Sequence, residues 1–223
     1  LIKLKKLNFI EKMESLISYH DSPISTISYF VHSLISEKAS KEGYRVVISG
    51  TGADELFTGY YDHFIYFLKE IEKFNLHNES LQYWNIYIKK FLRNPILKSP
   101  HSFLKNNNFK NFLYDSWKKN LNFMKSKTFK IFDDKKKYND LLRNRMFNEL
   151  FYEVIPVILH EDDMNSMMNS IENRSPYLDT DLYKFAFSIP TRYLIKKAFS
   201  KYILRECMKQ TISKKIRIDR QKK

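Results

Sequence analysis

Residues 46–60, VVISGTGADELFTGY, decide the fold class of this chain. The stretch opens with a short β-branched run that does not alternate with polar residues, as is typical of a parallel strand buried on both faces. A turn with two glycines follows, and acidic and apolar residues with helical spacing come after the turn. Because strand, glycine turn and helix in this order form a βα unit, the sequence predicts an α/β fold.

All four glycines of the chain fall in one short window, and they are Gly43, Gly50, Gly52 and Gly59. A chain that otherwise avoids glycine uses it where the backbone needs a positive φ or must approach another group closely. We therefore expect the chemistry of the chain to lie in this window.

The sequence on both sides of the window is predicted to be helical. Apolar residues recur at helical spacing over residues 23–42 and again from about 53 to 74. Further helices are predicted over residues 81–91, 141–155 and 201–209, and residues 75–160 are predicted to form a helical, insert-like region. Because one strand makes no sheet, we expect its partner strands in sequence upstream of this chain.

The composition excludes several classes of protein. Apolar residues make up 43% of the 223 residues, which is enough for a packed core and excludes a disordered chain. A single cysteine, Cys207, excludes a disulfide scaffold and a cysteine-based zinc site, and the six histidines lack the spacing of zinc ligands. No apolar run approaches the roughly 20 residues of a membrane helix, and the first residues do not form a signal peptide. We therefore expect no membrane partner and a cytoplasmic location.

The net charge of +14 has two explanations. A basic excess of this size can mark a nucleic-acid partner. It also follows from a composition rich in Lys, Asn, Ile, Phe and Tyr, which is typical of AT-rich coding sequences. Because the chain contains no motif of a nucleic-acid-binding fold, we expect no nucleic-acid partner, and a basic nucleic-acid module is kept as an alternative hypothesis.

Two acidic residues, Asp54 and Glu55, directly follow the glycine turn. The helix dipole stabilises acids in the first turn of a helix by about 0.3–1 kcal/mol each, which is a structural explanation. Carboxylates beside a phosphate site also hold Mg²⁺, which prefers oxygen ligands. The pattern Ser-Gly-x-Gly leaves both explanations open, because it is neither of the nucleotide-binding loops Gly-x-x-x-x-Gly-Lys-[Ser/Thr] and Gly-x-Gly-x-x-Gly.

Four segments, in order, resemble the asparagine synthase family. Residues 49–60 resemble its signature Ser-Gly-x-Gly-x-Asp-Glu-x-x-x-Gly-Tyr, and residues 163–179, DMNSMMNSIENRSPYLD, resemble its block Asp-Arg-x-Ser-Met…Ser-x-Glu-x-Arg-x-Pro-Phe-Leu-Asp. Residues 201–206, KYILRE, are similar to its Lys-x-x-Leu-Arg-Glu, and residues 220–222, RQK, are similar to its Arg-x-Lys. The resemblance extends from about residue 21 to residue 223, although residues 75–155 match only in being helical.

The resemblance implies an adenine-nucleotide α-hydrolase-like fold of the PP-loop ATP pyrophosphatase type. It implies an ATP- and Mg²⁺-dependent ligase that converts aspartate, glutamine and ATP to asparagine, glutamate, AMP and pyrophosphate through an acyl-adenylate. In the family, ammonia comes from glutamine, which a separate N-terminal glutaminase domain with a cysteine nucleophile hydrolyses. The implied partners are therefore ATP, a carboxylate acceptor and ammonia, and a homodimer is a further expectation.

The resemblance also implies roles for single residues. Backbone groups of Ser49, Gly50 and Gly52 would contact AMP and the activated carbonyl. Asp54 would hold Mg²⁺ on the pyrophosphate, and Glu55 would support it or orient the turn.

On the acceptor side, Thr51 and Asp163 would lie at the pocket, and Glu172 and Arg174 would brace it. Lys222 matches the lysine that neutralises the charge developing between the α-phosphate and the leaving group, which is worth several kcal/mol of the barrier. On the residues alone, a lysine in a basic tail would be assigned to solvent, so the role of Lys222 rests on the motif.

Departures from the family pattern bear on the function. The pyrophosphate loop Ser-Gly-Gly-x-Asp-Ser and a glutaminase are absent, so we expect residues 1–223 to be part of a synthetase domain that is inactive by itself. Thr51 stands where aspartate-using enzymes tend to have Glu, and Met164 replaces the usual Arg. These changes favour, as an alternative, a related glutamine amidotransferase that acts on another carboxylate, such as a sugar acid in surface polysaccharide synthesis. A non-catalytic paralogue is a second alternative, against which Lys222 argues.

Overall fold

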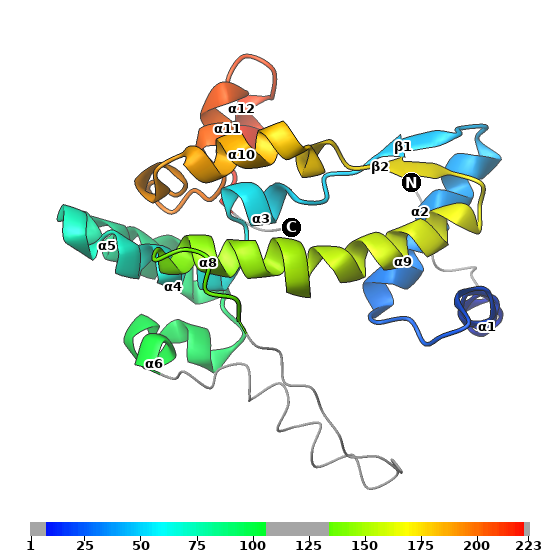
Figure 1. Ribbon diagram of the computed structural model, residues 1–223, viewed down its shortest axis with the longest axis horizontal. Helices are drawn as coiled ribbons and strands as arrows, with labels where there is room; N and C mark the ends of the chain where they lie inside the picture. The colour runs from blue at the N-terminus through cyan, green and yellow to red at the C-terminus, as the bar shows by residue number, and fades with distance from the viewer. Residues whose placement is uncertain (1–7, 106–133, 221–223) are drawn as a thin grey trace, which may run out of the picture. The chain divides into compact units, whose positions relative to one another are not determined.

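The computed structural model describes residues 8–105 and 134–220 (Figure 1). The chain divides into two compact units. Unit 1 comprises the described residues of Leu1–Leu56 and Glu149–Phe185, and unit 2 comprises those of Phe57–Asn148 and Ala186–Lys223. The glycine turn and the block at 163–179 therefore belong to unit 1, whereas the motif at 201–206 belongs to unit 2.

Unit 1 contains a two-stranded sheet and three longer helices. Its elements are α1 (Phe9–His20), α2 (Ile27–Lys41), β1 (Val46–Ile48), most of α3 (Ala53–Phe57), the π-helical turn η6 (Glu149–Glu153), α9 (Ile155–Met167), β2 (Glu172–Arg174), the 3₁₀ turn η7 (Pro176–Leu178) and the first part of α10 (Thr180–Ser188). Helix α9 packs against α2 and β2. Leu16 of α1 and Phe30 and Leu34 of α2 form a buried cluster, and each such side chain contributes about 1.5–3 kcal/mol by its burial.

The two strands of unit 1 pair in parallel. Val46 lies opposite Glu172 and Ile48 opposite Arg174, and Ser49 N donates to Arg174 O at 2.8 Å just beyond β1. Figure 1 shows β1 and β2 side by side, although they come from distant parts of the sequence. The predicted parallel strand is confirmed, but its partner among the described residues lies downstream, so the expectation of upstream partners is wrong for this pair.

The prediction that this strand is buried on both faces is also wrong within the described residues. Val46 is 41% exposed and Ile48 is 76% exposed, whereas Val47 between them is half-buried. A β-branched run is buried on both faces only where neighbouring strands and helices cover it. Because β1 pairs with one strand among the described residues, part of its apolar surface stays open.

Helix α2 begins later than its sequence pattern predicts. Thr26 has an extended backbone, with φ −150° and ψ 158°, and the helix begins at Ile27. The preceding Ser25 donates to Glu161 Oε1 from its backbone N (3.0 Å) and from its hydroxyl (2.5 Å). This contact ties the residue before Thr26 to α9.

Unit 2 is helical in its described residues. Its elements are α4 (Tyr61–Glu70), η2 (Glu72–Phe74), α5 (His77–Tyr87), η3 (Lys89–Phe91), η4 (Pro95–Lys98), α6 (Pro100–Lys105), α8 (Leu141–Asn148), η8 (Thr191–Tyr193), α11 (Tyr202–Cys207) and α12 (Lys214–Arg217). Helix α4 packs against α5, α6 and α8, and its core side chains Phe64, Ile65 and Leu68 are buried. The predicted region 75–160 is divided between the units, because the chain passes from unit 2 to unit 1 after Asn148.

The helix predicted over residues 53–74 is interrupted. Thr58 has a left-handed φ of 73°, and it ends α3 before α4 begins at Tyr61. Thr58 Oγ1 and Phe57 O both accept from Lys201 N, at 3.2 and 3.1 Å. The end of the first motif is thereby bound to the start of the third, and apolar spacing alone gives no sign of this break.

The predicted class, a mostly helical α/β chain with few strands, is confirmed. The helices predicted over residues 81–91, 141–155 and 201–209 correspond to α5 with η3, α8 with η6, and α11. Within the described part of the chain, no helix is long and apolar enough to cross a membrane.

Candidate active site

Side-chain hydrogen bonds tie the turn after β1 to the end of β2. Ser49 Oγ and Ser175 Oγ lie 2.9 Å apart, and Ser49 Oγ donates to Thr51 Oγ1 at 3.1 Å. Both serines directly follow their strands, so they lie at the carboxyl edge of the parallel pair. Ligands of open α/β sheets bind at this edge. The first and second sequence motifs therefore meet where a ligand is expected.

Gly52 satisfies both conditions that favour glycine. Its φ is +95°, and a Cβ atom at this position would lie 2.5 Å from Leu178 Cδ2 in η7. Around Gly50, in contrast, no atom of the described residues other than Gly50 itself and its two chain neighbours lies within 4 Å of the Cβ position. The prediction that these glycines stand where the backbone needs a positive φ or a close approach is confirmed at Gly52, which has both.

A cavity of about 350 Å³ adjoins this turn. It is lined from α9 and from the end of β2 by Leu159, His160, Asp162, Asp163, Asn173 and Ser175. Ser175 belongs both to this lining and to the hydrogen bond with Ser49, so the cavity and the glycine turn are neighbours. The described lining contains two carboxylates and no Lys or Arg. Asp163, which the resemblance assigns to the acceptor, lies in this cavity.

Asn173 is a cavity residue that the sequence reasoning missed. Its Oδ1 is buried and has no hydrogen-bond partner among the described residues. A buried acceptor without a partner costs about 1–3 kcal/mol, so a bound ligand or water that donates to it is favoured. A strand over residues 172–174 would have indicated this residue. Alternate side chains of a strand lie on the same face, so Asn173 and Ser175 lie on one face of the chain.

Glu172 and Arg174 occupy the opposite face of β2. Arg174 Nε donates to Glu172 Oε1 at 2.9 Å, and both side chains are exposed. The hydrogen bond from Arg174, together with its charge, lowers the pKa of the Glu172 carboxyl. The two residues are thus paired with each other, beside the exposed Val46 and Ile48, and their bracing role stays a prediction.

Asp54 and Glu55 lie in α3, directly after the turn, and their environments differ. Glu55 is buried, whereas Asp54 is partly exposed. The carboxylate of Asp54 is the kind of donor that Mg²⁺ prefers, and its partial exposure leaves room for phosphate oxygens and water. The burial of Glu55 suits a residue that orients the turn.

The three consecutive acids of α9 lie in different surroundings. Glu161 is buried, where it accepts from Ser25, and His20 Nδ1 lies 3.6 Å from Glu161 Oε2. Asp162 and Asp163 instead line the cavity. Because a buried carboxylate needs hydrogen-bond donors, the contacts of Glu161 fix α9 against α1 and α2 and thereby place the two acids that follow it.

In unit 2, Arg220 of the fourth motif contacts the loop that precedes the third motif. The Arg220 guanidinium lies 3.9 Å from the centroid of the Phe199 ring and 4.1 Å from that of Tyr87. Arg220 Nε donates to Lys197 O at 3.3 Å, in the loop that precedes the third motif. Lys222 lies outside the described residues, and its role stays a prediction.

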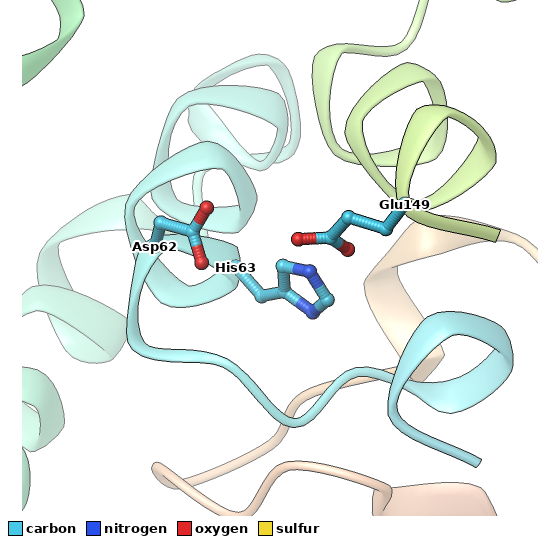
Figure 2. A group of neighbouring side chains, drawn as sticks. All are labelled: Asp62, His63 and Glu149. Atoms are coloured by element: carbon cyan, nitrogen blue, oxygen red, sulfur yellow. The ribbon is translucent and has the colours of Figure 1, made fainter. Parts of the chain in front are cut away.

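Asp62 and His63 begin α4 in unit 2, where Figure 2 shows both side chains. Arg145 Nε donates to Asp62 Oδ2 at 3.0 Å, and Gly59 N donates to His63 Nδ1 at 3.3 Å. Burial raises the pKa of the Asp62 carboxyl, but the charge of a protonated His63 and the charge and hydrogen bond of Arg145 outweigh burial and leave it below its ordinary value. Asp62 is therefore a structural ion-pair partner of α8, and Glu149, also labelled there, belongs to unit 1.

Comparisons with known proteins agree with the motifs. The family model described as asparagine synthase matches residues 2–223. Asparagine synthetase [glutamine-hydrolyzing] 1 of Bacillus subtilis (strain 168) is 24% identical over 215 residues, which cover 89% of this chain and 33% of that protein. The chain thus spans about a third of the length of this relative. No solved structure matches the chain significantly.

Proposed function

Because the chain belongs to the asparagine synthase family, we propose that it is part of an ATP-dependent ligase that forms an amide from a carboxylate and ammonia. The observation that carries this proposal is the hydrogen bond between Ser49 and Ser175. This bond brings the glycine turn next to the cavity that contains Asp163, and we assign the turn to the nucleotide and the cavity to the acceptor. Carboxylate activation requires this proximity, because holding two reactants in contact removes about 7–11 kcal/mol from a bimolecular barrier.

The proposed reaction has two displacements. First, a carboxylate oxygen of the acceptor attacks the α-phosphorus of ATP, and the bond to the bridging oxygen breaks so that pyrophosphate leaves. The acyl-adenylate is then attacked at its carbonyl carbon by ammonia, AMP leaves with the electron pair, and the nitrogen loses a proton. The products are the amide, AMP, pyrophosphate and a proton.

Each displacement needs groups that this chain supplies. We assign the backbone N–H groups at Gly50 and Gly52 to the oxygens that gain negative charge, since donors placed there act as an oxyanion hole worth a few kcal/mol. Asp163 and Asn173 line the cavity and orient the acceptor. Lys222 neutralises charge between the α-phosphate and the leaving group, as the motif predicts.

Mg²⁺ is the metal that the family resemblance implies. We assign the carboxylate of Asp54 as its protein ligand, because this side chain is partly exposed directly after the turn. Mg²⁺, when bound, neutralises the negative charge of the leaving pyrophosphate. Glu55, which is buried in the same short helix, holds the turn in place.

The acceptor is proposed to be aspartate, with a sugar acid as the alternative. Asp163 is in the described lining, which contains no Lys or Arg, and its carboxylate suits an acceptor that carries an ammonium group. Thr51 favours the alternative, because it offers a neutral hydroxyl, engaged with Ser49, where aspartate-using relatives tend to have a carboxylate.

The source of ammonia is a property of the complete protein. The name of the Bacillus subtilis relative describes it as glutamine-hydrolyzing. We propose that a separate glutaminase domain delivers ammonia from glutamine to this site as well. The cytoplasmic location and the homodimer stay predictions.

The test is product analysis with the complete protein. ATP, Mg²⁺ and glutamine are supplied with aspartate or with one of several sugar acids, and AMP and the amide are quantified by mass spectrometry. We expect AMP and asparagine in equal amounts from aspartate. An amidated sugar acid without asparagine would support the alternative acceptor, and no AMP with any acceptor would contradict the ligase proposal.

A further inference from the structure

Asp162 is a cavity residue to which no motif assigns a role. The acidic block that resembles the family begins one residue later, at Asp163. The Asp162 side chain is only 10% exposed, yet it belongs to the lining of the same cavity. A carboxylate this deeply buried requires a hydrogen-bonded partner to remain ionised.

His32 of α2 is that partner. His32 Nδ1 lies 2.8 Å from Asp162 Oδ1, which joins two residues 130 positions apart in the sequence. The His32 ring is held against Tyr29 of the same helix, with 5.7 Å between ring centroids and an angle of 87° between their planes. Because α2 and α9 pack along each other, the imidazole is a fixed donor that restricts the rotamer of Asp162.

The charge of His32 affects the net charge of the cavity, which two neighbouring aspartates line. Asp162 and Asp163 are consecutive residues of α9, and without a counter-charge they would repel each other and an incoming carboxylate. The hydrogen bond to Asp162 raises the pKa of His32, its burial opposes this, and the charge of Asp162 adds to the rise. A cationic His32 therefore persists to higher pH than an ordinary histidine.

Other titratable groups surround this pair. Tyr29 contacts the His32 ring, and burial, followed by the charges of Asp162 and Glu161, raises the pKa of its hydroxyl. His160 shares the cavity with Asp162. Among the described residues, Asp162 is the charged group that acts on His32, so the protonation of His32 depends on this one contact.

We propose that His32 is a positioning residue of the acceptor cavity: it fixes Asp162 by a hydrogen bond and, while protonated, cancels its charge so that an anionic acceptor can enter. The proposal rests on the proposed function, because it takes the occupant of the cavity to be a carboxylate. When His32 loses its proton, the charge of the cavity falls by one unit. The KM for the acceptor then rises with pH, because the cavity carries one more negative charge that repels the acceptor. We expect a rise of roughly fivefold in a partly screened site, and a smaller change in kcat.

The test combines kinetics with a direct titration of the histidine. In the complete protein, the KM for the accepted carboxylate is measured from pH 6 to pH 9 for the unaltered protein, H32Q and D162N. H32Q keeps a side chain that can donate to Asp162 but cannot be charged, so we expect its KM to stay at the high-pH value throughout. D162N removes the carboxylate whose charge His32 cancels, so at high pH its KM should be lower than that of the unaltered protein. H101Q, at an exposed histidine of unit 2, is the matched control and should keep the pH dependence.

The titration separates this proposal from the ligase proposal. NMR signals of the His32 ring are followed against pH, and we expect a pKa above the ordinary histidine value that falls toward that value in D162N. A His32 pKa that does not respond to D162N, or an unchanged pH dependence of KM in H32Q, would overturn the positioning role. A complete protein that turns over no carboxylate while His32 still responds to D162N would instead contradict the ligase proposal and leave the hydrogen-bonded pair established.

Discussion

Ser49 Oγ and Ser175 Oγ lie 2.9 Å apart, so the first residues after the two parallel strands are hydrogen bonded to each other. This contact joins the glycine turn to the cavity side of the site. We expect Ser49→Ala and Ser175→Ala each to lower the free energy of unfolding by about 0.5–1.5 kcal/mol. The double variant should cost less than the sum, because both changes remove the same bond.

A double-mutant cycle in urea measures this coupling. Its control is the pair Ser49→Ala and Ser102→Ala, since Ser102 bonds to Ser99 in unit 2. The control pair should show additive effects, and a Ser49–Ser175 pair that is also additive would contradict the contact.

Gly52→Ala should destabilise the protein more strongly than a normal glycine substitution. The added methyl group meets Leu178 at 2.5 Å, and the backbone stays in the left-handed region at φ +95°. Strain and overpacking together predict a loss of about 2–5 kcal/mol in the free energy of unfolding. Gly50→Ala makes the same chemical change where no described residue beyond the two chain neighbours lies within 4 Å of the added methyl group, and its effect should stay within about 1 kcal/mol. Urea unfolding measures both variants. If Gly52→Ala and Gly50→Ala lower the free energy of unfolding equally, the close approach of Leu178 to Gly52 is contradicted.

Glu172→Gln tests the predicted bracing role of Glu172 and Arg174, which pair on the face of β2 opposite to Asn173. Because Glu172 and Arg174 are exposed, we expect the unfolding midpoint to stay unchanged. If the pair braces the site, kcat/KM for the acceptor falls in Glu172→Gln and in Arg174→Gln to a similar extent. Full activity in both variants would remove these residues from the site, and Asn173→Ala serves as the comparison on the cavity face.

Asp62→Asn should change how the free energy of unfolding depends on pH at acidic pH. The pKa of Asp62 in the folded protein is lowered by His63 and Arg145 against the effect of burial, so its contribution is present above the ordinary aspartate pKa of 3.8 and is lost as the pH falls below it. We expect Asp62→Asn to cost about 2–4 kcal/mol at pH 7, since it removes a largely buried ion pair with Arg145, and to flatten the decline of stability below pH 4.

Thermal unfolding between pH 2 and pH 7 provides the measurement for Asp62. Asp181→Asn is the control, because Asp181 is exposed and pairs only at the surface with Lys184. Parallel profiles of the Asp62 variant and the unaltered protein would refute the assigned ion pair.

The first strand and its glycine turn were predictable because their signals are local. Val46, Val47 and Ile48 favour a strand by their β-branched side chains, and Gly52 is a residue that a chain poor in glycine keeps for a positive φ. The exposure of Ile48 was not predictable in this way, because burial depends on which elements cover the strand.

The second strand and the His32–Asp162 pair could not be read from local patterns. Residues Glu172–Arg174 are polar and have low strand propensity, and they are extended because β1 supplies their hydrogen-bond partners. The contact of His32 with Asp162 depends on how α2 packs on α9, and neither residue carries a motif. Sequence reasoning therefore found Asp163 through its motif and missed Asn173 and Asp162 beside it in the same cavity.

The central claim, that the turn at Ser49 and the cavity at Asp163 form a carboxylate-adenylating site, is tested most directly by pyrophosphate exchange in the complete protein. Labelled pyrophosphate enters ATP only if an acceptor is reversibly adenylated, and the assay does not require ammonia. We expect exchange that depends on aspartate and Mg²⁺ and falls at least a hundredfold in Asp54→Asn, whose unfolding midpoint is measured alongside. No exchange with aspartate or any sugar acid, or equal exchange in Asp54→Asn, would contradict the account.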